Sequence, residues 1–254
     1  SRGGSVSLEE RRVLRAIAAC RTAAMGGHVE QCDACGHEII AYNSCRNRHC
    51  PKCQAQARDA WIKKHEADLL PVEYFHGGFT MPRALAPIAR QNRIVVYDIL
   101  FRTAAQTLRQ IAADPRHLGA EIGVLAVLHT WGQNLEHHPH VHCIIPGGGI
   151  SPDGTRWVSC NRKFFLPVRV LSRLFRAKFL RALKAAFKEQ RLSFSGQIAE
   201  LADAASFRAH LAPLYSTDWF VYAKAPFNGP RHVLRYLARY THRVAISNSR
   251  LVAI

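Results

Sequence analysis

The chain has 254 residues, and its 48% hydrophobic and 21% charged content is typical of a globular protein. Its 35 Lys and Arg residues against 18 Asp and Glu residues give a formal net charge of +17, which favours nucleic acid as the partner. No apolar run approaches the roughly 18–20 residues that a membrane span needs, and no terminal segment has the basic amphipathic pattern of a membrane-surface helix, so we expect no membrane partner.

The eight Cys residues indicate the redox compartment, and the two ends of the sequence indicate whether the natural chain is longer. The first residues, SRGGSVS, lack a Met and the basic start and apolar core of a signal peptide, so we interpret them as a trimmed end. Without such a signal, the cysteines favour metal ligation in a reducing compartment over disulfides. The last residues, VAISNSRLVAI, fall in a strand-like pattern, and we expect the natural chain to continue.

Residues 1–70 are expected to form a helix followed by a zinc ribbon. Apolar residues recur at helical spacing over 8–24, and Cys20 among them is interpreted as a packing residue. Two Cys-x-x-Cys pairs follow, and four thiolates complete a tetrahedron around one structural zinc ion. No βαβ pattern surrounds either pair, which argues against a redox motif. The predicted ligands are Cys32, Cys35, Cys50 and Cys53, with Cys45 and His49 as alternates.

Basic residues surround the ribbon. Arg46, Arg48 and Lys52 suggest contacts with nucleic-acid phosphates, and a solvated basic rim is the competing interpretation. A domain boundary is expected between the helix that follows the ribbon and Val72.

Residues 71–254 are expected to form a second domain of mixed helices and strands. Apolar alternation, turn residues and helical periodicity separate its elements. The predicted strands are 72–82, 124–129, 138–145, 218–227 and 244–247. The predicted helices are 54–69, which follows the ribbon, and 84–113, 169–190 and 231–243 in the second domain.

A His-x-His pair lies in one of these strands. His140 and His142 flank Val141, and alternate residues of a strand share a face. If the preceding strand pairs with this one as an antiparallel hairpin, His129 lies opposite the pair and is the predicted third metal ligand, with Gln133 as the alternative. An isolated His-x-His is more often the polar face of an edge strand, but further histidines crowd this hairpin and favour a metal site.

Two tyrosines share one face of the last predicted helix. Tyr236 and Tyr240 are four residues apart, and Arg235, Arg239 and Arg243 interleave with them. Both phenols could be core residues, but the arginines argue against a dry face. Phenols beside cations are held more acidic than usual, which suits nucleophiles.

Metal-ligating histidines and two tyrosines together predict one reaction. The metal polarises a phosphate, and a tyrosine oxygen attacks it, leaving a covalent phosphotyrosine and a free 3′-hydroxyl. Because the phosphoester bond is conserved, a second attack can rejoin strands without ATP. The chain carries no Walker-type glycine loop, so we expect no use of nucleotide fuel.

The sequence resembles the HUH endonuclease superfamily in YNSCRNRHCPKCQ, LHTWGQNLEHHPHVHCIIPGGG and KAPFNGPRHVLRYLARYTHRVAISNSRL. Within it, the chain is most similar to two-tyrosine transposases of rolling-circle insertion sequences, the insertion-sequence ninety-one type. The resemblance implies an α+β fold with an antiparallel sheet of about five strands, flanked by helices. It also implies Tyr236 and Tyr240 as nucleophiles, His140 and His142 as ligands of Mg²⁺ or Mn²⁺, and single-stranded DNA or DNA hairpins at transposon ends and target as substrates.

Alternatives remain open at this point. Replication initiators and relaxases of the same superfamily share the chemistry. Three imidazoles suit Zn²⁺ or Mn²⁺ better than Mg²⁺, so a three-histidine zinc hydrolase is a further enzyme hypothesis. A non-catalytic zinc-ribbon DNA-binding protein is the hypothesis from another class. The resemblance implies a prokaryotic cytoplasmic location at the nucleoid, with any helicase supplied by the host.

Overall fold

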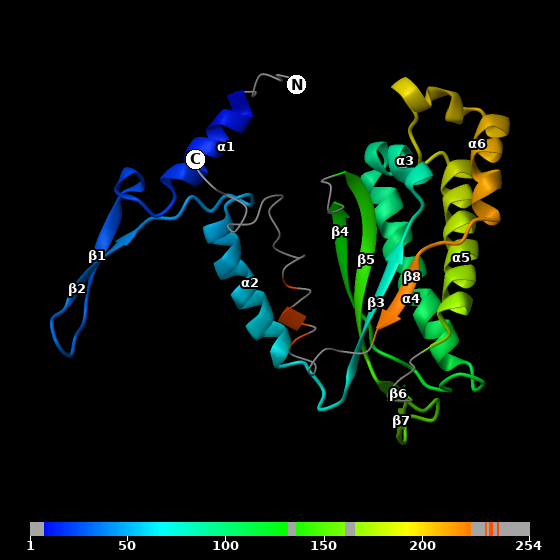
Figure 1. The fold of residues 1–254 in the computed structure, drawn as a ribbon, viewed down its shortest axis with the longest axis horizontal. Helices are drawn as coiled ribbons and strands as arrows, with labels where there is room; N and C mark the ends of the chain where they lie inside the picture. The colour runs from blue at the N-terminus through cyan, green and yellow to red at the C-terminus, as the bar shows by residue number, and fades with distance from the viewer. Residues whose placement is uncertain are drawn as a thin grey trace. The chain divides into compact units, whose positions relative to one another are not determined.

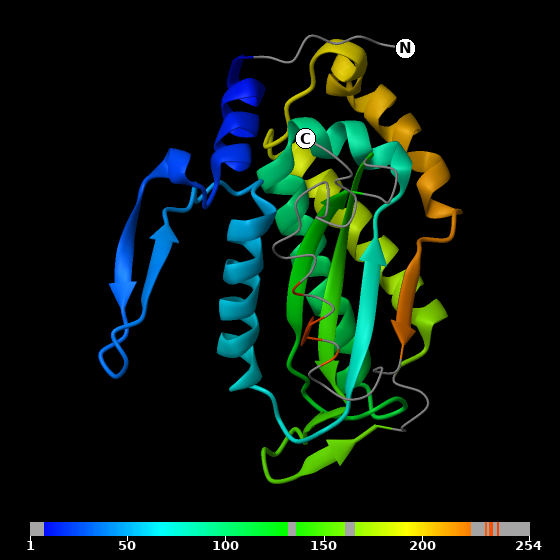
Figure 2. The same ribbon diagram turned by 60° about the vertical axis from the view of Figure 1, so that its left-hand side comes forward.

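The computed structural model describes most of the chain, and Figures 1 and 2 show its ribbon. The described residues are 8–131, 136–160 and 166–224, with His232, Leu234, Arg235 and Ala238 in a further helical segment. The chain divides into two compact units, with the break between Ala67 and Asp68. No helix in these ranges is long and apolar enough to span a membrane.

The N-terminal unit consists of two helices and a hairpin. Its elements are α1 (Leu8–Ala19), the 3₁₀ turn η1 (Ala23–Met25), β1 (Gly27–Gln31), β2 (Glu38–Tyr42) and α2 (Pro51–Glu66). Strands β1 and β2 pair antiparallel, with Val29 opposite Ile40. Helix α2 begins at Pro51, earlier than the periodicity predicts, because proline is suited to a first helical turn, where its missing N–H is not needed.

The second unit is built on an antiparallel sheet with strand order β4-β5-β3-β8, which confirms the α+β class. These strands are β3 (Tyr74–Thr80), β4 (Leu125–Trp131), β5 (His137–Pro146) and β8 (Val221–Lys224). A small second sheet pairs β6 (Gly148–Ile150) with β7 (Trp157–Ser159). The described sheet has four strands rather than the expected five, and the fifth predicted strand, 244–247, lies outside the described residues.

Helices cover one face of this sheet, as Figure 2 shows. The helices are α3 (Ala86–Gln91), α4 (Arg93–Ala113), α5 (Val168–Lys188) and α6 (Ala204–Leu211), with 3₁₀ turns η2 (Arg83–Leu85), η3 (Gly196–Ala202) and η4 (Ala212–Tyr215). Helices α4 and α5 pack on each other, α4 against β5 and α5 against β8. The core between the two layers includes Val141, Cys143 and Ile145 of β5, all fully buried. The other face of β5 therefore carries its alternate residues.

The helical stretch expected at 84–113 is broken at Asn92, whose ψ of 47° lies outside the helical range. Its buried side-chain amide donates to the carbonyls of Ile88 and Ser193, at 3.0 and 2.9 Å. Its Oδ1 accepts from the N–H of Ser193 at 2.7 Å. One amide thus fixes the kink and anchors the segment that follows α5.

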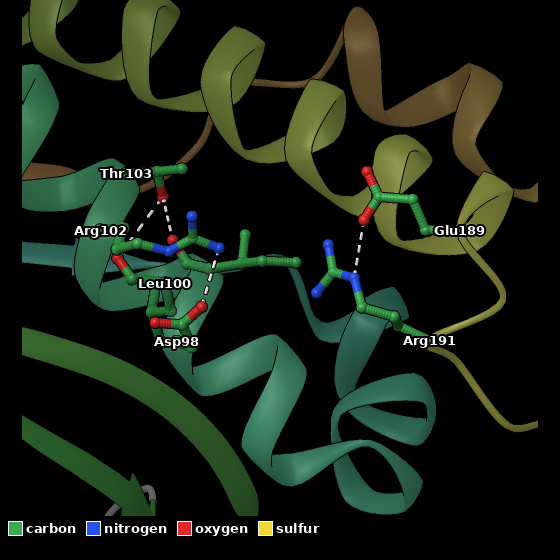
Figure 3. A network of polar contacts seen from close by, with 7 residues as sticks. Asp98, Leu100, Arg102, Thr103, Glu189 and Arg191 are labelled. Carbon is green, nitrogen blue, oxygen red and sulfur yellow. Dashed lines mark hydrogen bonds and ion pairs between the residues drawn. The ribbon is translucent and has the colours of Figure 1, made fainter.

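Helix α5 ends in a left-handed cap. Gln190 has a φ of 55°, and the N–H of Arg191 donates to the carbonyl of Ala186 at 2.9 Å, which satisfies a carbonyl of the last turn. Arg191 also pairs with Glu189 at 2.7 Å, as Figure 3 shows. Both side chains are largely exposed, so the backbone bonds rather than this ion pair end the helix.

Candidate functional site

Three histidines meet on the sheet face opposite the helices. The register of β4 and β5 pairs His129 with His140, and one ring nitrogen from each of His129, His140 and His142 lies within 4.8 Å of the others. Val141 between the last two is fully buried in the core. The hairpin geometry predicted from the alternation is therefore confirmed, while Gln133 lies outside the described residues.

Hydrogen bonds orient the His140 ring. Its Nδ1 lies 2.7 Å from the carbonyl oxygen of His138, which only a donor can satisfy, so Nδ1 carries the proton. The unprotonated Nε2 then lies 3.0 Å from Nδ1 of His129. Two neighbouring ligands of an octahedral ion at about 2.1 Å are separated by about 3.0 Å. The spacing of these two nitrogens fits a shared metal ion.

A second group of side chains holds His142. Its Nδ1 lies 2.9 Å from Nε2 of His76 on β3 and 3.0 Å from the hydroxyl of Tyr222 on β8. That hydroxyl is also 3.2 Å from Nε2 of His76. His76 therefore lies beside the three-histidine group and contacts it through His142. Metal-binding imidazoles usually have their second nitrogen fixed in this way.

Tyr222 reaches His142 because a glycine lies between them. Gly78 of β3 is opposite His142 on one side and opposite Tyr222 on the other. A Cβ at Gly78 would lie 2.2 Å from Cε1 of Tyr222, so no other residue type fits under the ring. The missing side chain lets the phenol lie across β3.

Burial keeps these imidazoles neutral. It lowers the pKa of His142 to about 3, with a smaller contribution from the neighbouring imidazoles, and it also lowers the pKa of His140. Burial and the charge of Lys224 lower the pKa of His76 to about 4. Neutral imidazole is the form that binds metal ions, so the site is prepared for a metal at neutral pH.

Four thiols meet in the N-terminal unit. The sulfur atoms of Cys20, Cys45, Cys50 and Cys53 all lie within 4.8 Å of one another, and the sulfur of Cys53 is 3.6 Å from that of Cys20 and 3.8 Å from that of Cys45. Zn–S bonds of about 2.3 Å in a tetrahedron separate sulfurs by about 3.8 Å. The donor set and its spacing therefore fit zinc.

The position of α2 explains part of this arrangement. Cys50 occupies the N-cap position and Cys53 lies in the first turn, where the helix dipole favours thiolates. The N–H of Cys45 lies 3.4 Å from the sulfur of Cys20. Burial, followed by the neighbouring thiols, raises the pKa of Cys45 to about 12, so a cation is needed to deprotonate this thiol at neutral pH.

This group differs from the four cysteines chosen from the sequence. Cys50 and Cys53 belong to it, but Cys32 and Cys35 are exposed residues that follow β1, outside the group, and Cys20 and Cys45 take the other two positions. The alternate ligand His49 is exposed and outside it as well. Sequence reasoning missed Cys20 because its helical context is apolar. Six of the eight cysteines fall in the first 53 residues, more than one tetrahedron needs, and that surplus was the available signal.

Of the residues predicted to contact DNA, three are exposed arginines and one is a lysine that also supports the four-thiol group. Arg46, Arg48 and Arg235 are exposed. Lys52 donates from Nζ to the carbonyl of Cys20 at 3.0 Å, so it also braces the thiol group. Arg239, Arg243, Tyr236 and Tyr240 lie outside the described residues.

Known proteins match both parts of the chain. Residues 1–81 match the family described as "Transposase zinc-binding domain", and residues 123–254 match the family described as "Putative transposase". "Putative transposase y4qJ" of Sinorhizobium fredii is 61% identical over 250 residues, which are 98% of this chain and 63% of that protein. The transposase for insertion sequence element IS801 of Pseudomonas savastanoi pv. phaseolicola is 29% identical over 254 residues, covering 98% of this chain and 58% of that protein.

The chain thus spans about three fifths of the length of these relatives. A solved structure of the conjugative relaxase TrwC in complex with oriT DNA has a TM-score of 0.36 at 14% identity, covering 65% of this chain and 68% of that one, which is too distant to support an assignment. The family matches at both ends confirm the resemblance seen in the sequence: this chain belongs to the "Putative transposase" family and carries the zinc-binding domain of IS91-type transposases.

Proposed function

We propose that this chain cleaves and rejoins single-stranded DNA through a covalent 5′-phosphotyrosine in rolling-circle transposition. The observation that carries the proposal is the convergence of His129, His140 and His142 on one sheet face, in a chain whose relatives are transposases. The net charge of +17 supports binding to the phosphates of the DNA strands and hairpins at transposon ends and target.

Nδ1 of His129 and Nε2 of His140 and His142 are the atoms that we assign as ligands of the catalytic metal. Bound there, Mg²⁺ or Mn²⁺ would polarise the scissile phosphate and stabilise the charge of the transition state. An all-imidazole set favours Mn²⁺ of the two. With Nε2 directed to the ion, Nδ1 of His142 carries a proton and donates to Tyr222, whose own hydroxyl donates to His76. This chain of donors holds the imidazole in the tautomer that binds metal.

Tyr236 and Tyr240 are the proposed nucleophiles. A phenol oxygen attacks the phosphorus, the bond from phosphorus to the 3′-oxygen breaks, and the strand leaves with a 3′-hydroxyl. Attack by a 3′-hydroxyl on the phosphotyrosine reverses the step and joins strands. In the last described helical segment Leu234 and Ala238 are buried, whereas Arg235 is exposed, so these residues show one face against protein and another toward solvent. An exposed arginine next to Tyr236 in the sequence supports a DNA-facing side.

Zinc at Cys20, Cys45, Cys50 and Cys53 is the proposed structural metal of the N-terminal unit. Its four thiolates leave no open position for substrate, which is the arrangement of structural rather than catalytic zinc.

Adduct formation on a single-stranded oligonucleotide tests the proposal. Wild type should give a covalent protein–DNA band on a denaturing gel, Tyr236→Phe and Tyr240→Phe should each reduce it, and the double variant should give none. Tyr215→Phe, at an exposed tyrosine of η4, is the matched control. A three-histidine zinc hydrolase would cut without any adduct, and a non-catalytic DNA-binding protein would not cut. An adduct in the double variant would show that the nucleophile is another residue.

A further inference from the structure

The β1–β2 hairpin lacks a core of its own. Every residue of β1 is exposed, and β2 has only one that is half-buried. Val29 and Ile40, which face each other across the strands, are 60% and 61% exposed. A two-stranded hairpin without a buried face is at best marginally stable in water. This hairpin therefore needs another source of stability.

The turn that closes the hairpin has the form of a metal knuckle. The N–H of Cys32 donates to the carbonyl of His37 at 2.9 Å, and the N–H of Gly36 donates to the carbonyl of Cys32 at 2.8 Å. Gly36 has a φ of +70°, which glycine adopts without strain. The backbone N–H groups of Ala34 and Cys35 hydrogen-bond the Cys32 sulfur. Two thiols three residues apart on one tight turn can reach the same ion.

A third ligand lies across the turn. Gln31 and Glu38 are the last paired residues, so the next pair is Cys32 and His37, which the backbone bond between them also shows. Cross-strand partners share a face, with Cβ atoms about 5 Å apart. Glu30, two residues before Cys32 on its strand, lies on the same face.

These donors are separate from the four buried thiols. Among the described residues, the donor atoms within 4.8 Å of one another form two groups, the four thiols of Cys20, Cys45, Cys50 and Cys53 and the three catalytic-site imidazoles, and both exposed thiols lie outside them. One ion cannot serve both Cys-x-x-Cys pairs. We propose that the hairpin end binds a second zinc ion through Cys32, Cys35 and His37, with the carboxylate of Glu30 in the fourth position.

This zinc would hold the two strands together at the turn that joins them. The site would form only when the hairpin folds. The free energy of zinc binding would therefore add to the folding free energy of a segment that buries no side chain. The ligands are exposed, so they can rotate onto the ion without disturbing a core. The proposal is independent of the strand-transfer activity, because it concerns a site in the N-terminal unit only.

The zinc content of the full chain tests the proposed hairpin site. It is measured by elemental analysis and native mass spectrometry after dialysis under reducing conditions. Wild type should hold about two zinc ions per chain, and the Cys32→Ser/Cys35→Ser variant about one. His37→Ala should lose the second ion to a chelator at concentrations that leave it in His117→Ala, at an exposed histidine of the second unit. Amide exchange of residues 27–42 should speed up only in the variants that lose zinc.

Retention of two ions by the double serine variant would overturn the proposal, and so would a wild type with one ion that the variant keeps. A wild type with one ion that the variant loses would support the hairpin site and contradict the buried one. Circular dichroism and the remaining zinc ion show whether the variant has folded.

Discussion

The hydroxyl of Tyr222 lies 3.0 Å from Nδ1 of His142, although strand β3 lies between their two strands in the sheet. The phenol spans that strand over Gly78, the residue opposite both. A tyrosine on β8 therefore controls the orientation of a proposed metal ligand two strands away in the described sheet.

Tyr222→Phe should weaken metal binding while leaving the fold intact, because it removes only the hydroxyl that holds the His142 ring. Loss of such a supporting hydrogen bond typically lowers metal affinity about 10–100-fold. Mn²⁺ titration by electron paramagnetic resonance measures this directly, and added Mn²⁺ should restore adduct formation. Tyr215→Phe is the control. Unchanged Mn²⁺ affinity in Tyr222→Phe would show that the hydroxyl does not support the ligand.

Gly78→Ala should be destabilising, because its Cβ would lie 2.2 Å from the Tyr222 ring. Overpacking of this kind costs about 1–3 kcal/mol in the free energy of unfolding. The penalty should disappear in a Tyr222→Ala background, which a urea double-mutant cycle measures. Gly77→Ala, whose Cβ would have its nearest contact with the flexible end of Ile145 at 3.0 Å, is the milder control. An equal cost of Gly78→Ala with and without the Tyr222 ring would contradict this account of the glycine.

Acid should destabilise the second unit. The pKa of His142 in the fold is about 3 and that of His76 about 4, both below the value of 6.5 for an unperturbed imidazole. The unfolded chain therefore binds more protons as the pH falls below about 6.5, so the stability conferred by neutral imidazoles is lost toward lower pH. Urea unfolding without added Mg²⁺ or Mn²⁺ should show this loss between neutral pH and about pH 5. His76→Gln should reduce the slope, and an unchanged slope would argue against a buried neutral His76.

Loss of the buried zinc should unfold the N-terminal unit and spare the sheet. Cys45→Ser removes one of four thiolates, and site and fold form together in small zinc domains. Limited proteolysis should then cut within residues 8–67 and leave the second unit intact. Cys160→Ser, at a half-buried cysteine of the second unit, is the matched control. Protection of residues 8–67 after zinc removal would contradict the assignment.

The local part of the site was predictable and the distant part was not. Strand alternation places His140 and His142 on one face, and a short hairpin brings His129 opposite them. Tyr222 is 80 residues from His142 and His76 is 66 residues from it, and only the strand order β5-β3-β8 joins them. No local pattern encodes that order.

The cysteines show the same limit. A Cys-x-x-Cys pair predicts that its own two thiols can share an ion, because the spacing fits one tight turn. It does not predict which other cysteines complete the site. Cys20 is 33 residues from Cys53, and α1 brings it there from an apolar sequence that gives no sign of ligation.

The most direct test of the central claim is adduct formation by His140→Ala/His142→Ala on a single-stranded oligonucleotide across a range of Mn²⁺ and Mg²⁺ concentrations. Wild type should form a metal-dependent adduct that mass spectrometry places on Tyr236 or Tyr240. The double variant should form none, yet bind the oligonucleotide with nearly wild-type affinity, because the basic surface supplies the binding. Full adduct formation by the double variant would contradict the assignment of the three histidines as the catalytic metal site.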